Sequence, residues 1–130
     1  MDSRPLVMVV EDDEEMNELE CELLQIHGMD TVSAFDGAEA IEASHHCSAD
    51  AVLLDIMLPE MDGYECCHHL RETMDRHLPI ILVTALDSTR SREEGLAAGA
   101  DAYFTKPFDP QEVVDAVRRL VDLFPAVDSA

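Results

Sequence analysis

The sequence predicts an α/β domain in which a parallel β-sheet is covered by helices on both faces. Two patterns predict it. Five short, nearly continuous apolar runs alternate with five longer segments whose apolar residues recur at helical spacing. Continuous apolar runs are typical of strands buried on both faces, and regular alternation with helices favours parallel pairing. The 130 residues predict one domain over 1–130, with a core from about 5 to 124 and residues 125–130 as a tail or the start of a linker.

The first half of the chain predicts three strands and two helices. In chain order they are a strand at Leu6–Val10, a helix at Glu14–His27, a strand at Asp30–Ala34, a helix at Ala38–Cys47 and a strand at Ala51–Leu54. The first run is continuous and rich in β-branched residues, as expected of a buried strand. The first helix carries an apolar stripe at steps of three and four residues. That stripe consists of Met16, Leu19, Leu23 and Ile26.

The second half predicts two strands and three helices. In chain order they are a helix at Gly63–Met74 after a loop at Pro59–Gly63, a strand at Leu78–Thr84, a helix at Arg90–Ala98, a strand at Ala102–Thr105 and a helix from Pro110 to about Phe124. The last helix has the clearest start. Asp109 is its N-cap, Pro110 takes its first position and Glu112 its third.

The composition is strongly acidic. Asp and Glu number 29 against 8 Lys and Arg, giving a net charge of −21. This charge argues against nonspecific binding to nucleic acid or to an anionic membrane. A salt-adapted proteome is one explanation, and an acidic signalling domain from an ordinary cell is the other. A melting temperature that rises in molar potassium chloride would favour the first.

The sequence also favours a cytoplasmic location. No apolar run approaches the roughly 20 residues of a membrane helix, and the start lacks the pattern of a signal peptide. The four cysteines, which include the adjacent Cys66 and Cys67, are expected to be reduced thiols.

Polar residues follow four of the predicted strands at the point where each ends. Glu11 and Asp12 follow the first strand, Asp55 follows the third, Thr84 ends the fourth and Lys106, the chain's one lysine, follows the fifth. Because ligands bind beyond the carboxyl ends of parallel strands, we expect these side chains to converge.

The predicted cluster suits phosphoryl transfer. Three carboxylates in one pocket repel each other and require a cation, and oxygen ligands favour Mg²⁺. Asp55 then serves as a nucleophile towards phosphorus, while Lys106 supplies a second cation and Thr84 a hydroxyl donor.

These residues resemble the receiver domain of two-component response regulators. The resemblance rests on five motifs: Val9-Val10-Glu11-Asp12-Asp13, Leu53-Leu54-Asp55-Ile56-Met57-Leu58-Pro59, Met61-Asp62-Gly63, Val83-Thr84-Ala85 and Lys106-Pro107-Phe108. It covers about residues 5–124. Each motif alone is weak, but five in the right order are specific.

The resemblance implies a role for each site residue. Asp55 is then the phosphoacceptor and takes phosphate from a histidine kinase or a phosphotransfer protein. Mg²⁺ is held directly by Asp12, Asp55 and the backbone carbonyl of Met57, and largely through water by Glu11. Thr84 and Lys106 contact the phosphoryl group, and Tyr103 is the switch aromatic that moves inward as Thr84 moves towards the phosphate.

The resemblance also implies a fold and an output. The fold is the flavodoxin-like (βα)5 arrangement with strand order 2-1-3-4-5, and the Lys106–Pro107 bond is cis. Phosphorylation changes the partner affinity of the face formed by the fourth helix, fifth strand and fifth helix. The protein is then a signalling switch that catalyses its own phosphorylation, not a metabolic enzyme.

Two apolar residues imply a long-lived signal. Met57 lies two residues beyond Asp55, and Leu86 lies two beyond Thr84. Receiver domains that hydrolyse their own phosphate quickly tend to carry polar groups at these positions. The resemblance therefore implies slow self-dephosphorylation.

The residues disfavour three other interpretations. A phosphate-independent receiver-like binding module is disfavoured by the intact Asp55, Thr84 and Lys106. An aspartyl-phosphate phosphatase needs an acid two residues after the nucleophile, where this chain has Met57. Zinc binding by Cys66-Cys67-His68-His69 or His45-His46-Cys47 is disfavoured because adjacent helical residues diverge by about 100°.

The sequence leaves the biological context open. It names no kinase, effector or pathway. The chain is either a stand-alone regulator or the front part of a longer regulator or hybrid kinase, and homodimerisation through the last helices is undetermined.

Overall fold

The computed structural model describes residues 4–74, 76–86 and 88–125. Within these ranges, five strands alternate with five helices. They are β1 Leu6–Val10, α1 Glu14–Ile26, β2 Asp30–Ala34, α2 Gly37–Ser44, β3 Ala51–Leu54, α3 Gly63–Thr73, β4 Ile80–Thr84, α4 Thr89–Ala97, β5 Ala102–Thr105 and α5 Pro110–Leu123. Residues 126–130 of the predicted tail lie outside the described ranges.

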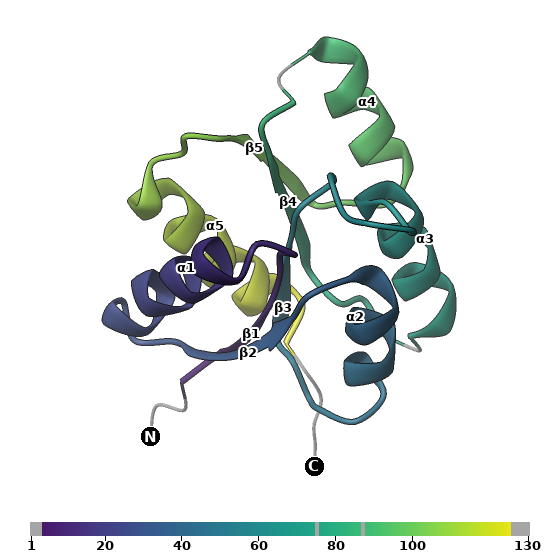
Figure 1. Cartoon of the computed structure of the whole chain (residues 1–130). Helices are drawn as coiled ribbons and strands as arrows, with labels where there is room; N and C mark the ends of the chain where they lie inside the picture. Colours follow the sequence, from purple (N-terminus) through teal and green to yellow (C-terminus); the bar gives the residue numbers. More distant parts are fainter. Residues whose placement is uncertain (1–3, 75, 87, 126–130) are drawn as a thin grey trace.

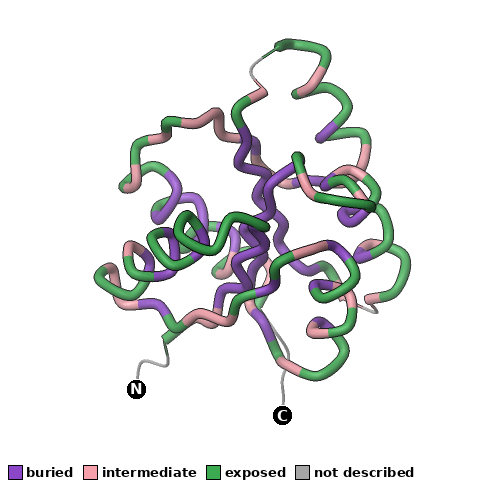
Figure 2. The backbone as a smooth tube through the Cα atoms, in the orientation of Figure 1, coloured by how far each residue is buried: buried purple, intermediate pink, exposed green. Residues whose placement is uncertain are grey.

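The strands form one parallel sheet in the order β2-β1-β3-β4-β5, which confirms the predicted flavodoxin-like fold. Helices α1 and α5 cover one face, and α2, α3 and α4 cover the other (Figure 1). Alternate residues of β1 enter opposite cores: Met8 and Val10 pack beneath α2 and α3, whereas Val7 and Val9 pack beneath α1 and α5. Strands β1, β3 and β4 are therefore buried on both sides, as Figure 2 shows for the centre of the molecule, whereas the edge strands β2 and β5 are only partly buried.

Each helix begins at a polar N-cap, which fixes where the preceding loop ends. The caps are Asp13, Asp36, Asp62, Ser88 and Asp109. In α3, Asp62 and Glu65 form a reciprocal capping box. The Glu65 amide donates to the Asp62 carboxylate, and the Asp62 amide donates to the Glu65 carboxylate. The predicted Asp109 cap and the Pro110 start of α5 are confirmed.

Two predicted boundaries differ from the structure by two residues or more, and the remaining differences are of one residue. Helix α2 ends at Ser44 instead of Cys47, where the Ser44 hydroxyl donates to the carbonyl of Ile41 and competes with the helical ladder. Strand β4 begins at Ile80 instead of Leu78. Pro79 has no N–H for the ladder, and the first strand amide, that of Ile80, donates to Asp101.

The apolar stripe of α1 identifies the helix but not its buried face. Met16, Leu19 and Ile26 are 36%, 55% and 81% exposed. The buried residues of α1 are instead Asn17, Glu20, Cys21 and Leu24. This face is partly polar because its first turns lie over the strand ends, where Asn17 donates to the carbonyls of Val9, Glu11 and Ala34.

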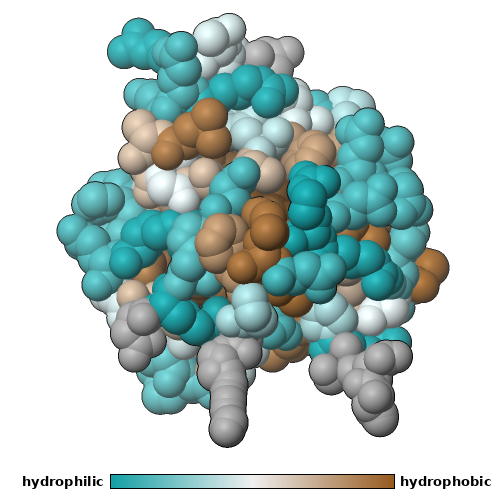
Figure 3. Space-filling model, turned by 180° about the vertical axis from the view of Figure 1, so that it is seen from behind, coloured by the Kyte–Doolittle hydropathy of each residue, from teal (hydrophilic) through white to brown (hydrophobic). Residues whose placement is uncertain are grey.

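The outer surface carries the acidic charge. Seen from behind, most of the molecule is hydrophilic, with hydrophobic atoms grouped in patches at the centre and upper left of the view (Figure 3). Among the described residues, no helix combines the length and the apolar character needed to cross a membrane.

Candidate functional site

The carboxyl ends of β1 and β3 bring two acidic residues together. Val10 pairs with Leu54 in the sheet, and the next residues along each strand are Glu11 and Asp55. The Asp55 amide donates to the Val10 carbonyl at 3.0 Å, which continues the ladder one step beyond the strands. Both acidic residues are buried: Glu11 is 4% exposed and Asp55 9%.

Lys106 reaches this acidic pair from the end of β5. Its Nζ donates to Glu11 Oε1 at 2.7 Å and to Asp55 Oδ2 at 3.0 Å. The backbone places it there, because the Lys106 amide donates to the Thr84 carbonyl at 2.7 Å. The Lys106–Pro107 bond is cis, as predicted. The structure therefore unites residues that follow the first, third and fifth strands.

Burial and charge set the protonation of this cluster. Burial raises the pKa of Glu11, and the nearby Asp55 raises it further, while the bond from Lys106 offsets part of the shift. Burial alone would lower the pKa of Lys106, but its bonds to Glu11 and Asp55 outweigh burial and raise it. Lys106 is therefore a permanent cation beside Asp55.

The loop after β3 holds the Asp55 carboxylate from its other side. The Met57 amide donates to Asp55 Oδ1 at 3.0 Å, and the Gly63 amide donates to the Ile56 carbonyl at 2.8 Å. A Cβ at Gly63 would lie 2.5 Å from both the Asp55 carbonyl oxygen and Ile56 Cα. Only glycine allows α3 to start this close to the Asp55 backbone.

Thr84 and Tyr103 form a second group beside the site. Thr84 is fully buried, and its hydroxyl accepts a bond from the Leu86 amide at 3.4 Å. The Tyr103 ring is 9% exposed, and its hydroxyl donates to the Leu86 carbonyl at 2.7 Å. Arg92 of α4 covers the ring, with its guanidinium carbon 5.0 Å from the ring centre. Thr84 and Tyr103 are thus joined through the backbone of Leu86.

The remaining predicted residues lie at the edge of the cluster. Asp12 directly follows Glu11 and is exposed, and the Met57 side chain is 58% exposed. Within the described ranges, no hydrogen bond joins Asp12 or Thr84 to Asp55. The structure brings Glu11, Asp55 and Lys106 into contact, and Met57 is bonded to Asp55 through its backbone amide. Asp12 and Thr84 make no direct bond to these residues among those described.

Sequence reasoning missed two residues of α1, Asn17 and Glu20. Asn17 is 1% exposed and ties α1 to the ends of β1 and β2 through three carbonyls within 3.2 Å. Glu20 is 5% exposed, and its Oε2 lies 3.9 Å from Lys106 Nζ. The signal was their spacing with Cys21 and Leu24, which places all four on one helical face.

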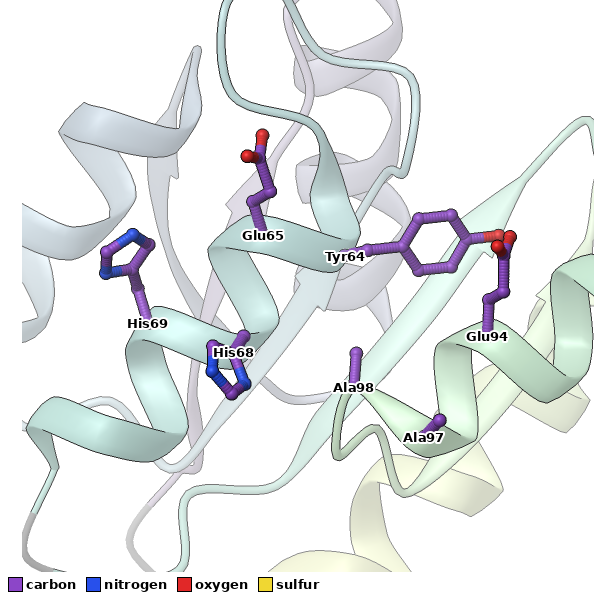
Figure 4. A pocket seen from close by; sticks show the side chains of 7 residues that line it. All are labelled: Tyr64, Glu65, His68, His69, Glu94, Ala97 and Ala98. Atoms are coloured by element: carbon purple, nitrogen blue, oxygen red, sulfur yellow. The ribbon is translucent and has the colours of Figure 1, made fainter.

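A separate cavity of about 500 Å³ opens between α3 and α4. Figure 4 shows His68 and His69 on α3 and Glu94 on α4, with the His69 ring on the far side of α3 from Glu94. His68 is paired with Glu72 at 3.2 Å. These side chains do not converge on one point.

The neighbouring thiols are also poorly suited to zinc. Burial raises the pKa of Cys66 to about 12 and that of Cys67 to about 11, so forming the thiolates that zinc binds is costly at these positions. In the part of the chain that the structure describes, no group of three His, Cys, Asp or Glu side chains is already drawn together as a metal cage.

Comparison with known proteins agrees with the fold. Residues 7–118 match the family model described as "Response regulator receiver domain". The chain belongs to this family, the receiver domains of two-component response regulators.

Individual relatives support this membership. Response regulator MprA of Mycobacterium sp. (strain KMS) is 42% identical over 115 residues, which are 88% of this chain and 50% of that protein. The Francisella response regulator 1452 receiver domain is 35% identical with a TM-score of 0.86, over 92% of this chain and 98% of that one. The chain therefore spans about half the length of the curated relative and nearly all of the solved receiver domain.

One solved relative contains a metal. The receiver domain of sensor histidine kinase PA1611 from Pseudomonas aeruginosa PAO1 has a magnesium ion coordinated in its active site cleft. It is 29% identical, with a TM-score of 0.84, over 92% of this chain and 99% of that one.

Proposed function

We propose that Asp55 accepts a phosphoryl group from a histidine kinase or phosphotransfer protein and that this modification switches the protein's affinity for a downstream partner. The observation that carries the proposal is the contact between Asp55 and the Lys106 ammonium in a buried acidic cluster. In the transfer, a carboxylate oxygen of Asp55 forms a bond to phosphorus, the bond from phosphorus to the donor imidazole nitrogen breaks, and that nitrogen regains its electron pair. The domain's own side chains catalyse this step by positioning and by charge.

The residues around Asp55 suit Mg²⁺ by their chemistry. Asp12, Asp55 and the Met57 carbonyl would hold it directly, and Glu11 through water. All four are oxygen donors, as a hard cation requires, and Mg²⁺ takes few carboxylates and keeps several waters, so it needs no cage of three carboxylates. The ion would supply positive charge that offsets the charge of the incoming phosphoryl group.

Lys106 and Thr84 complete the phosphoryl contacts. Lys106 moves its ammonium from the carboxylates towards the new phosphoryl oxygens, to which it is held by charge. The Thr84 hydroxyl exchanges its weak 3.4 Å bond from the Leu86 amide for donation to a phosphoryl oxygen. This exchange disturbs the Leu86 backbone, to which the Tyr103 hydroxyl is bonded.

We place the responding surface on α4, β5 and α5. Gly95 is the one buried residue of α4 among those described, and a Cβ there would lie 2.7 Å from Leu82 Cδ1. Most residues of α4 are exposed, as the tube in Figure 2 shows. With so little apolar side-chain burial, α4 is weakly anchored. Arg92 of this helix also donates to the Tyr103 carbonyl, so movement of Tyr103 is transmitted to α4.

We infer that the phosphoryl donor approaches over α1. That helix starts two residues after Asp12, and its first two turns expose Met16 and Leu19. A protein donor that brings its phosphohistidine to Asp55 contacts these apolar side chains. Leu19→Glu should therefore slow transfer from a protein donor and leave transfer from acetyl phosphate unchanged.

Nuclear magnetic resonance tests the switch. The phosphoryl mimic beryllofluoride, added with Mg²⁺, should shift the backbone amide signals of α4, β5 and α5 in the native chain and not in Asp55→Asn. Shifts confined to the residues next to Asp55 would contradict the switch. No response from a folded native chain would favour the phosphate-independent binding module.

A further inference from the structure

Glu20 is a buried carboxylate that the proposed phosphoryl chemistry does not use. It lies on the second turn of α1, is 5% exposed, and directs Oε2 to within 3.9 Å of Lys106 Nζ. Within the described residues, this buried oxygen accepts no hydrogen bond. A buried carboxylate without a full set of partners is costly, so its position calls for a functional reason.

The surroundings of Glu20 connect it to the site. Lys106 is the cation that faces it, and Glu11 and Asp55 are the two anions that raise its pKa together with burial. Three buried carboxylates therefore surround one ammonium. Glu11 and Asp55 take two of the three N–H groups of that ammonium, and Glu20 is the third carboxylate within 4 Å.

We propose that Glu20 is a positioning residue, which holds the Lys106 ammonium from its buried side and adds negative charge that favours a bound cation and opposes the phosphoryl group. It thereby keeps the unphosphorylated state populated and sets how strongly Asp55 retains phosphate. The phosphoryl part of this inference depends on the function proposed above, whereas the effect on Lys106 and on cation binding does not.

The electrostatic signs make this inference distinct from a packing role. Neutralising an anion weakens the binding of a nearby cation and strengthens the binding of a nearby anion. A variant that merely loosened α1 would weaken both. Glu20→Gln, which keeps the shape and removes the charge, should therefore change the two affinities in opposite directions.

The chain itself offers a single-site probe of Lys106. Because Lys106 is its one lysine, ¹⁵N labelling of lysine side chains yields one ammonium signal. We would record it in the native chain, in Glu20→Gln and in the control Glu22→Gln, which removes the same charge from an exposed position two residues away. Mg²⁺ is titrated first, and beryllofluoride is then titrated at saturating Mg²⁺, at about pH 8, where Glu20 is mostly ionised.

The expected result has three parts. In Glu20→Gln the Lys106 signal moves, Mg²⁺ binds about three- to tenfold more weakly, and beryllofluoride binds about three- to tenfold more tightly. In Glu22→Gln both affinities stay within about twofold of the native values, because solvent screens an exposed charge. If Glu20→Gln fails to fold, Glu20→Leu is measured in its place, since it removes the charge and fills the buried space.

Other outcomes overturn the inference. Affinities that fall together indicate a structural role, and affinities that match those of the control indicate no role. An unchanged Lys106 signal excludes the contact. If the native chain binds Mg²⁺ but neither beryllofluoride nor a phosphoryl group, the proposed function fails, while the Lys106 signal and the Mg²⁺ affinity still decide the role of Glu20.

Discussion

The Lys106 ammonium lies 2.7 Å from Glu11 Oε1, the shortest of its ion pairs in the structure. The two residues are 95 positions apart in the chain, and the sheet brings them together by placing β1 and β5 in one layer. Their contact means that one cation balances several buried acids before any phosphoryl group arrives. The stability of the fold and the chemistry of the site are therefore linked through Lys106.

Removing Lys106 should destabilise the protein in a pH-dependent manner. Lys106→Met leaves Glu11, Asp55 and Glu20 without their cation, and we expect a loss of about 2–4 kcal/mol at neutral pH without Mg²⁺. This loss of stability should shrink at lower pH, because protonation of the carboxylates removes the repulsion between them. Chemical denaturation at several pH values measures this. Arg4→Met, which breaks the exposed pair with Asp30, is the control and should cost less than about 1 kcal/mol. A Lys106→Met loss that does not vary with pH would contradict the account.

Glu20 should make the stability fall as pH rises. Burial is the main cause that raises the pKa of Glu20 from 4.5 to about 7. The positive charge of Lys106 opposes this shift, and the negative charges of Glu11 and Asp55 add to it. A raised folded-state pKa means that the folded state binds this proton more tightly. The stabilisation of the fold by the protonated Glu20 is complete below about pH 4.5 and is lost as pH rises through about 7.

The comparison of native protein with Glu20→Gln isolates this effect. In Mg²⁺-free buffer, the native protein should lose on the order of 2 kcal/mol relative to Glu20→Gln between about pH 4.5 and 8. Denaturation midpoints across this interval measure it. A constant difference between the two proteins would show that the Glu20 pKa is the same in the folded and unfolded states.

Gly63→Ala should strain the site through its backbone. The added Cβ meets the Asp55 carbonyl oxygen and Ile56 Cα at 2.5 Å, and backbone atoms cannot rotate away. We expect a loss of about 2–3 kcal/mol in thermal or chemical unfolding. The matched control is Gly37→Ala, whose Cβ meets the flexible side chain of Met61 and should cost less than about 1 kcal/mol. Equal losses in the two variants would refute this explanation.

Met57 should control how long the phosphoryl group lasts. Its side chain is 58% exposed beside Asp55, where it offers no polar group to hold an attacking water. Met57→Asn should therefore shorten the lifetime of the phosphorylated state several-fold, as measured by loss of the phosphoryl mass with time. Rapid loss in the native chain, unchanged in Met57→Asn, would contradict the expected slow self-dephosphorylation.

The parts of the fold that follow from local chemistry could be predicted from the sequence. The apolar runs mark β1, β3 and β4 because strands buried on both faces admit little else. The convergence of Glu11 and Asp55 was predictable as well, since their polar side chains stop two such runs at the same sheet edge. Pro110 and its Asp109 cap fix the start of α5 in the same local manner.

The orientation of α1 could not be predicted from its apolar pattern. Three of its four stripe residues, Met16, Leu19 and Ile26, face outwards, while Leu23 packs partly against the core. The inner face must instead satisfy the carbonyls at the strand ends, which Asn17 does. Glu20 was missed for a related reason. Its spacing with Cys21 and Leu24 places it on the inner helical face, but the cation that it faces there, Lys106, is distant in sequence.

The most direct test is the intact mass of the protein after incubation with acetyl phosphate and Mg²⁺, at low and at high salt. Asp55→Asn and a chelator serve as controls. We expect one phosphoryl adduct per chain that requires the metal and is absent in Asp55→Asn. A folded native chain that gains no adduct at either salt concentration, or an adduct that persists in Asp55→Asn, would contradict the assignment of Asp55 as the phosphoacceptor.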